Sequence, residues 1–369
     1  MGKRIMLPAN EVDVADAQYL QERIKSPHLT GFLLKLFVWL VESRLFGHAI
    51  VSFLKRQNKM TQILRHTVIP EAPMFFPEFP PQEPETAVDY VDEDTQPILR
   101  VEHALQCLCS YDSSKASRAA CSKSFSYWTI RDYADAYRSG RTTPSDVAEY
   151  IISAVEESLN NKPPVIFFIS FIANELRKQA AASTRRFEEG MPLSVLDGIF
   201  VSIKDDIDCY PHPSKGGTVW FHKIRDVKQD AVCVSRLRSC GVILAGKANM
   251  HELGMGVTGN NPHYGTTRNP HSTQCYTGGS SSGPAAIVAS GLCPVSLGTD
   301  GGGSVRIPSA LCGVVGFKTT YGRTDITGSL CEGGTVEVIG PMAATVEDVM
   351  LVYAAMSGSS TVDLARLTP

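Results

Sequence analysis

Short apolar runs recur along the second half of the chain, and each predicts a buried element of an α/β fold. The run from Ile199 to Ile203 predicts a strand that places Lys204 at its end. Val242 to Ala245 predicts a second buried strand, and the pair Val314-Val315 a shorter one. Between Pro284 and Asp300, the pattern predicts a helix with a proline in its first turn, followed by another buried strand.

Helix boundaries follow from capping residues and prolines. Thr143 followed by Pro144 predicts the start of one helix, and a second helix is expected over Ala173 to Glu189. Thr345, with Asp348 three residues later, predicts the cap of a last helix that ends near Met356. The buried face of the first helix is expected to consist of Val147, Tyr150, Ile151 and Val155.

The segment from Leu29 to Leu54 is amphipathic and predicts two helices broken near Ser43 to Gly47. Its apolar positions are Phe32, Leu33, Leu36, Phe37, Leu40, Val41, Ala49, Ile50, Phe53 and Leu54. Polar positions interrupt this run too often for a membrane span, namely Lys35, Glu42, Arg44 and His48. Periodicity favours burial of the apolar face on the protein's own core or on a second subunit. A membrane interface, with Trp39 and Lys35 at the boundary, is the alternative.

Composition describes a chain of mixed character that can bury a large core. It has 369 residues, of which 43% are hydrophobic and 20% charged, with a net charge of -3. This near-neutral balance gives no reason to expect nucleic acid as a partner. The ten cysteines lack the dense spacing of secreted disulfide frameworks, which favours reduced thiols in an intracellular compartment. The amino terminus lacks the pattern of a signal peptide.

Two serine-bearing glycine loops are the strongest chemical signal. They are Gly278-Gly-Ser-Ser-Ser-Gly283 and Gly301-Gly-Gly-Ser304. The predicted helix carries the chain away from Ser280, and the predicted strand returns it beside Ser304. Consecutive N–H groups next to a serine hydroxyl can form an oxyanion hole, although tight turns use the same residues. A phosphate-binding loop is disfavoured because no Gly-Lys-Ser/Thr follows either loop.

Lys204 closes an apolar strand, a position that a solvated end charge usually occupies. Held among apolar walls, it would instead favour its neutral form, because burial disfavours the ammonium. Nearby positive charge would strengthen this effect. A neutral lysine can act as a base.

Lysine and serines in this spacing resemble the amidase-signature family. The matching segments are Gly278–Gly283, Gly298–Ser309, Gly246–Glu252, Tyr264–Pro270 and Gly316–Arg323. Towards the amino terminus, the chain is similar to the plant fatty acid amide hydrolases of this family. That closer similarity rests on Pro27–Gly31, Val68–Phe75 and Pro77–Pro80.

The resemblance implies a role for each site residue. Ser304 would be the acyl-forming nucleophile, Ser280 the bridging serine on a cis peptide, and Lys204 the base. The oxyanion would be bound by N–H groups of Gly301, Gly302, Gly303 and Ser304. No cofactor and no metal are implied. The implied substrates are fatty acid amides such as N-acylethanolamines, cleaved by an intracellular homodimer that lies peripherally on the endoplasmic reticulum or plasma membrane.

The implied fold is α/β: a mixed central sheet flanked by helices on both faces, with an N-terminal helical arm. We expect the arm over residues 1–69, a proline-rich linker over 70–97 and the catalytic core over 98–369. Similar chains continue beyond Pro369, so an incomplete sheet is expected. Two alternatives stay open. One is an inactive fragment that binds acyl lipid or pairs with a full-length subunit, and the other is an amidase for small non-lipid amides.

Other chemistries fit the sequence less well. His251-Glu252 begins like a zinc-binding helix, but Met255 stands where the second histidine belongs; the family resemblance gives this segment a structural role near the substrate loop. Asp205, Asp206 and Asp208 could suggest a cation site. Adjacent strand residues point to opposite faces, so solvated or locally bonded carboxylates are expected instead. A Ser-His-Asp triad has no histidine within the serine motif.

Overall fold

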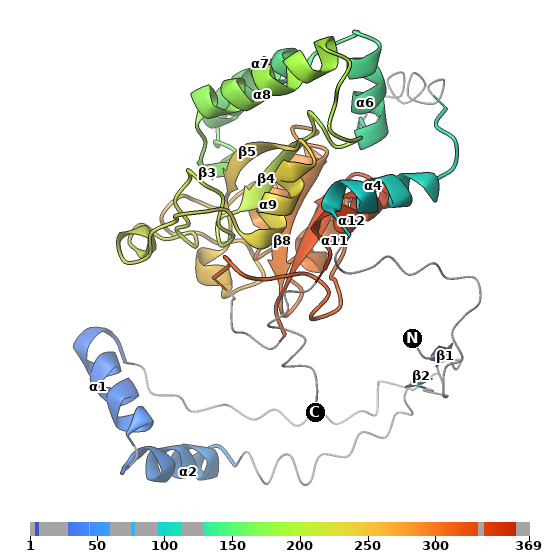
Figure 1. Ribbon diagram of the computed structural model, residues 1–369. Coiled ribbons are helices and arrows are strands. Elements are labelled where there is room, and N and C mark those ends of the chain that lie inside the picture. The colour runs from blue at the N-terminus through green and yellow to red at the C-terminus, as the bar shows by residue number, and fades with distance from the viewer. Residues whose placement is uncertain are drawn as a thin grey trace, which may run out of the picture. The chain divides into compact units, whose positions relative to one another are not determined.

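The computed structural model describes residues 4–6, 29–43, 45–59, 75–77, 95–112, 128–330 and 336–358. The chain divides into two compact units, residues 1–90 and 91–369 (Figure 1). We describe each unit by itself.

The first unit contains two helices and a small sheet. Helices α1 (Gly31–Glu42) and α2 (Gly47–Gln57) confirm the predicted pair and its break. A side chain at Gly47 would collide with the backbone carbonyl of Val41, so this turn requires glycine. Strands β1 (Arg4–Met6) and β2 (Phe75–Pro77) pair antiparallel.

Helix α1 exposes its apolar side chains, and none of its residues is buried. Phe32 is 77% exposed and Trp39 is 65% exposed. Within the described residues, no single helix is long and apolar enough to cross a membrane. Helices α1 and α2 pass that test of length and composition only as a pair, bent by 105°. Both interpretations of this apolar face therefore stay predictions.

The second unit is built on a mixed sheet. Its strands are β3 (Phe168–Ser170), β4 (Phe200–Lys204), β5 (Ile243–Ala248), β8 (Val295–Asp300), β9 (Val315–Gly316) and β10 (Val338–Ala343). Their order is β3-β5-β4-β8-β10-β9. The central strand β4 runs parallel to β5 and β8, and the outer pairings are antiparallel. The predicted strands and the mixed sheet are confirmed.

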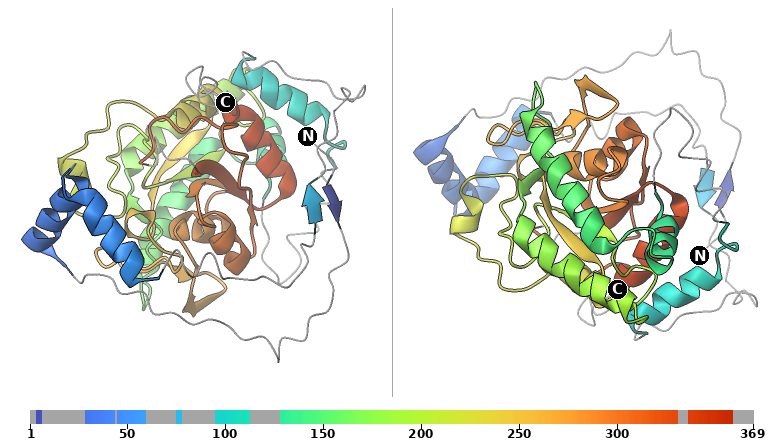
Figure 2. Two further views of the ribbon diagram at one scale, coloured as in Figure 1. Left: turned by 90° about the horizontal axis from the view of Figure 1, so that it is seen from below. Right: turned by 90° about the horizontal axis from the view of Figure 1, so that it is seen from above.

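Helices cover both faces of this sheet (Figure 2). Val295 and Leu297 of β8 belong to a core cluster shared with α4 (Pro97–Gln106), α6 (Ile130–Arg138), α9 (Val232–Ser239) and α12 (Val346–Met356). Residues of α10 (Ser282–Ala289) and α11 (Arg306–Cys312) cluster with Met342 of β10. Another cluster joins α10 to α7 (Pro144–Asn160), α8 (Ala173–Glu188) and Ile243 of β5. Alternation along the strands thus supplies apolar side chains to both faces, where they form three core clusters.

The helix caps form as predicted, but one predicted core residue is exposed. Thr143 accepts a hydrogen bond from the Asp146 backbone in a capping box at the start of α7. Thr345 caps α12 in the same way through Asp348. Tyr150, expected on the buried face of α7, is 67% exposed. The buried stripe lies to one side of the predicted one and contains Ala148, Ile151, Ile152, Val155 and Ser158.

A hairpin leads into the first glycine loop. It consists of β6 (Arg268–Asn269) and β7 (Ser272–Tyr276), and every residue of β7 is exposed.

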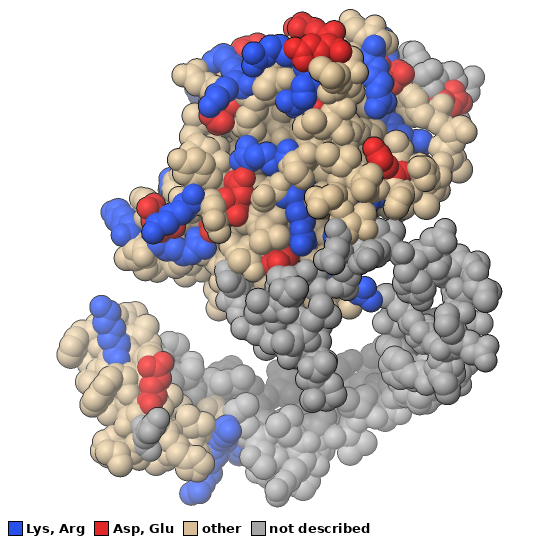
Figure 3. Space-filling model, in the orientation of Figure 1, with Lys and Arg blue, Asp and Glu red and all other residues tan. Residues whose placement is uncertain are grey.

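Basic and acidic side chains are interspersed over the face of the second unit shown in Figure 3. That face carries no large region of a single charge sign.

Candidate active site

Lys204 is the last residue of β4 and is fully buried. The parallel register of β4 and β8 aligns Ile203 with Leu297, so Lys204 lies beside the end of β8. There the Lys204 ammonium nitrogen Nζ lies 2.6 Å from Thr299 Oγ1. The predicted placement of a lysine at the end of a buried strand is confirmed.

Ser280 lies between β7 and α10, and the peptide bond before it, Gly279-Ser280, is cis, as the resemblance implies. Lys204 Nζ donates to Ser280 Oγ at 2.7 Å. The His251 backbone N–H donates to the Ser280 carbonyl oxygen at 3.0 Å. His251 therefore anchors the serine loop through its backbone.

Close backbone approaches fix the rest of this loop. The Gly283 N–H donates to the Asn249 carbonyl at 2.8 Å, and a Cβ atom at Gly283 would lie 2.5 Å from the Asn249 nitrogen. A Cβ atom at Gly298 would likewise lie 2.6 Å from Ser281 Oγ. Only glycine fits at these two positions, because real Cβ atoms do not approach other atoms so closely.

Ser304 lies in the second glycine loop, between β8 and α11. The Ser281 N–H donates to the Ser304 carbonyl oxygen at 3.1 Å, which joins the two serine loops through their backbones. Ser304 keeps 9% of its surface exposed, whereas Ser280 keeps 1% and Lys204 none. Ser304 is therefore the most exposed of the three residues, and its side chain makes no hydrogen bond with Ser280 or with any other residue in the described part of the chain.

The Asp300 carboxylate organises the second glycine loop. It accepts from the N–H groups of Gly303 at 2.8 Å and Val305 at 3.0 Å, and it binds the Arg306 guanidinium at 2.9 Å. Burial alone would raise the pKa of Asp300, but Arg306 and these N–H groups hold it below its usual value.

This network engages the N–H group of one of the four predicted oxyanion donors. The N–H of Gly303 already donates to Asp300, so it is not free to bind an oxyanion. The N–H groups of Gly301, Gly302 and Ser304 make no hydrogen bond with the described part of the chain. These three N–H groups are therefore available to a ligand, and the oxyanion role of all four residues stays a prediction.

The carboxylates after β4 were expected to be solvated or locally bonded, and they are buried and bonded. Asp206 is 5% exposed, and its Oδ2 atom lies 3.1 Å from Lys204 Nζ. Thr299 donates to the same Oδ2 at 2.8 Å. The chain turns directly after the strand, where the Ile207 N–H donates to the Lys204 carbonyl, and this turn brings Asp206 to the lysine. The charge in contact with Lys204 is thus negative.

Asp205 lies against a second buried lysine. Its Oδ1 atom lies 3.6 Å from Lys247 Nζ, and both side chains are fully buried. Burial raises the pKa of Asp205 to about 6, although the Lys247 charge opposes this. Asp208, the third carboxylate, pairs with Arg225 at 2.6 Å. Each of the three carboxylates therefore has its own cation.

Glu337 and His251 are two further titratable residues near Lys204. Glu337 is half-buried before β10, and its side chain lies against Gly301. Burial raises the pKa of Glu337, and the Asp206 charge adds to this effect. Burial lowers the pKa of His251. Sequence patterns gave no role to Glu337, which lies outside every recognisable motif.

The structure gives no support for the metal and histidine alternatives. The described residues contain no cluster of His, Cys, Asp or Glu able to hold a metal ion. Glu252 pairs instead with His263 at 2.8 Å. The buried His212 bonds to Ser170, which is neither of the serines discussed above.

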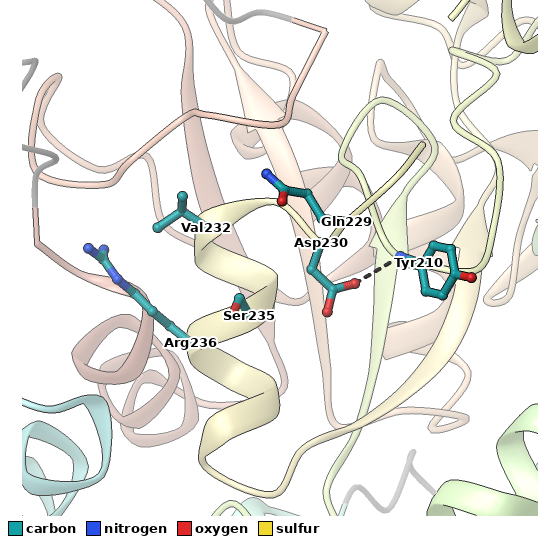
Figure 4. A pocket seen from close by; sticks show the side chains of 6 residues that line it. All are labelled: Tyr210, Gln229, Asp230, Val232, Ser235 and Arg236. Carbon is teal, nitrogen blue, oxygen red and sulfur yellow. Dashed lines mark hydrogen bonds between the residues drawn. The ribbon is translucent and has the colours of Figure 1, made fainter. Parts of the chain in front are cut away.

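A cavity of about 500 Å³ lies beside α9, and its lining includes none of Lys204, Ser280 and Ser304. It is lined by Tyr210, Gln229, Asp230, Val232, Ser235 and Arg236 (Figure 4). Asp230 accepts from the Tyr210 N–H at 2.8 Å at its edge. None of the lining residues belongs to the serine and lysine cluster.

Comparison with known proteins places this cluster in context. Residues 151–369 match the amidase family. The chain belongs to the amidase family. Among solved amidases, the peptide amidase of Stenotrophomonas maltophilia is 29% identical with a TM-score of 0.60, over 65% of this chain and 50% of that one. A bacterial aryl acylamidase of the amidase-signature family is 30% identical with a TM-score of 0.58, over 65% and 49%.

Plant amidases match over the whole chain. A fatty acid amide hydrolase of Arabidopsis thaliana is 64% identical over 370 residues, and one of Oryza sativa subsp. indica is 61% identical over 371. Both alignments cover 100% of this chain and 61% of the relative. This amidase chain therefore spans about three fifths of the length of those relatives.

Proposed function

We propose that the chain catalyses hydrolysis of fatty acid amides, with N-acylethanolamines giving a fatty acid and ethanolamine. The observation that carries this proposal is the 2.7 Å hydrogen bond from Lys204 Nζ to Ser280 Oγ, inside a buried site next to the Ser304 loop. The substrate class rests on the plant relatives, which are named fatty acid amide hydrolases and share 61% to 64% of their aligned residues with this chain.

The proposed mechanism uses a serine-serine-lysine relay. Ser304 Oγ attacks the amide carbonyl carbon while its proton passes to Ser280, whose own proton passes to Lys204. The tetrahedral oxyanion accepts hydrogen bonds from the N–H groups of Gly301, Gly302 and Ser304. The relay then reverses and protonates the leaving amine, because an amine leaves poorly as an anion. Water hydrolyses the acyl-enzyme in the second half.

The test is hydrolysis of a long-chain N-acylethanolamine together with labelling by a fluorophosphonate, which bonds to an activated serine. We expect Ser304→Ala to lose labelling and to lower turnover by a factor on the order of 10⁴ or more. Ser290→Ala is the matched control, because the Ser290 hydroxyl donates to the Ile287 carbonyl at the end of α10 and has no other hydrogen bond among the described residues. Equal labelling of the wild type and Ser304→Ala would disprove the assignment of the nucleophile.

A second candidate is an amidase for small amides. It is favoured by the indoleacetamide hydrolase of Pseudomonas savastanoi, 43% identical over 49% of this chain. Comparing kcat/KM for long-chain and short-chain amides separates the two. A strong preference for short amides would contradict the lipid proposal while leaving the relay intact.

A further inference from the structure

The buried carboxylate of Asp206 is the feature that the proposed relay does not use. Its Oδ2 atom contacts both Lys204 Nζ at 3.1 Å and Thr299 Oγ1 at 2.8 Å. Lys204 Nζ in turn lies 2.6 Å from the same threonine oxygen and 2.7 Å from Ser280 Oγ. The four side chains form one connected, buried network.

The second oxygen of this carboxylate has no partner. Asp206 Oδ1 is buried and makes no hydrogen bond with the described residues. A buried carboxylate is costly unless a cation compensates it. Lys204 is the cation in contact, since Lys247 lies against Asp205.

Several other charges face this pair from neighbouring elements. Glu337, preceding β10, interacts with both Asp206 and Lys204, and with Asp300 at the end of β8. His251, after β5, interacts with Lys204. Asp205 and Lys247 interact with each other, and Asp205 also with Asp206. Of these, Asp206 alone has an oxygen in ion-pair contact with Lys204 among the described residues.

We propose that Asp206 is a positioning residue of the relay: with Thr299 it holds Lys204 Nζ against Ser280, and its charge stabilises the proton that Lys204 accepts. This inference rests on the proposed function. In the first half-reaction, Ser280 gives its hydroxyl proton to Lys204 and receives the proton of Ser304. The ammonium so formed is paired with Asp206, and the same proton returns through Ser280 to the leaving amine.

Asp206→Asn tests this, because it removes the charge and keeps the shape. The pH dependence of fluorophosphonate labelling of Ser304 is the readout. The carboxylate charge that Asp206→Asn removes favours the protonated relay, so the acidic limb of the labelling rate is expected to move to lower pH in the variant. The limiting rate at alkaline pH falls, because Lys204 Nζ is held less firmly against Ser280 Oγ. A merely structural role would lower the rate without moving the limb.

Two control variants distinguish the role of Asp206 from that of the nearby carboxylates Asp208 and Glu337. Asp208→Asn makes the same change in the same segment, but Asp208 contacts Arg225 and Ser214, so the limb is expected to stay in place. Glu337→Gln tests the other carboxylate near the pair. The proposal would be overturned if the acidic limb of the labelling rate stayed in place in Asp206→Asn, or if only Glu337→Gln moved it.

A second measurement does not depend on hydrolysis. In a double-mutant cycle of thermal unfolding, Asp206→Asn should lower Tm more in the wild type than in Lys204→Met, because only the wild type leaves a buried ammonium unpaired. Asp206→Leu replaces Asp206→Asn if the latter does not fold. Additive changes in Tm would refute the pairing. If the wild type is not labelled by the fluorophosphonate at all, the proposed function is refuted. The Tm cycle still shows whether Asp206 pairs with Lys204.

Discussion

Individual carboxylates in this amidase are defined by the cation that each one meets. Asp205, Asp206 and Asp208 are close in sequence, yet they contact Lys247, Lys204 and Arg225 respectively. The sequence predicted the position of Lys204 but not these pairings. Residues 204 and 247 become neighbours only through the parallel pairing of β4 and β5, which no local pattern encodes.

Asp197 allows the contribution of a buried carboxylate–cation pair to the free energy of unfolding to be measured. Its fully buried carboxylate binds the Arg186 guanidinium at 2.7 Å, and it also accepts from Ser183 and from the Leu193 N–H. Asp197→Asn should lower the free energy of unfolding by about 3 kcal/mol, because it leaves buried donors unpaired. Chemical denaturation measures this change.

Asp135→Asn is the matched control for that experiment. Asp135 pairs with Arg141, but the two side chains are 37% and 51% exposed. Solvent screens such a pair, so the expected loss is below about 1 kcal/mol. Equal losses in the two variants would contradict the dependence on burial.

At the scale of elements, one aspartate joins two helices. Asp348 belongs to the cap of α12, as predicted, and its Oδ1 atom also accepts from the Ile130 N–H at the start of α6. The sequence indicated the cap because its partners are three residues apart. It could not indicate the bond to Ile130, which lies 218 residues away.

This buried aspartate predicts a pH dependence. Burial raises the pKa of Asp348 from 3.8 to about 6. The folded state therefore holds this proton more tightly than the unfolded chain, so its contribution to stability is present below about pH 4 and is lost as the pH rises through about 6. The loss should amount to about 3 kcal/mol. Subtracting the unfolding curves of Asp348→Asn from those of the wild type, measured between pH 4 and 7.5, isolates it.

Other titrating groups cancel in that difference. A difference that is constant with pH would show that Asp348 binds its proton no more tightly in the folded state. A difference that grows with pH would reverse the predicted sign. Thr143→Ala, which removes the cap of α7 without removing a charge, should give a constant difference of about 1 kcal/mol.

At the scale of the molecule, the sequence predicted the fold class, strands β4, β5, β8 and β9, helices α7, α8, α10 and α12, and the two arm helices. Periodicity, caps and prolines indicated these elements, whereas β3, β10 and helices α4, α6, α9 and α11 were not predicted. On the buried face of α7, Ile151 and Val155 are buried as predicted, but Tyr150, which fits the same apolar stripe, is exposed. The pairing of β1 with β2 joins segments about 70 residues apart and had no sequence signal.

We propose that the exposed apolar face of α1 binds a membrane surface, the alternative to burial on the core or on a second subunit. Phe32→Glu combined with Trp39→Glu should weaken cosedimentation with phospholipid vesicles by about tenfold or more, because two large apolar side chains are lost. Gln57→Glu adds a charge to α2 without removing apolar surface and is the control. Unchanged vesicle binding together with a smaller oligomer in sedimentation equilibrium would favour the second-subunit interpretation instead.

The pairing of β4 with β8 has a consequence for the newly made chain. Lys204 meets Thr299 only because Ile203 aligns with Leu297 in the sheet. A slip of one residue would turn Lys204 to the opposite face and away from Ser280. In the proposed mechanism, that slip would leave Ser280 without its base. An activated serine can attack other cellular amides and esters, so the proposed relay would have a built-in protection: the nucleophile would become reactive only after the chain has folded correctly.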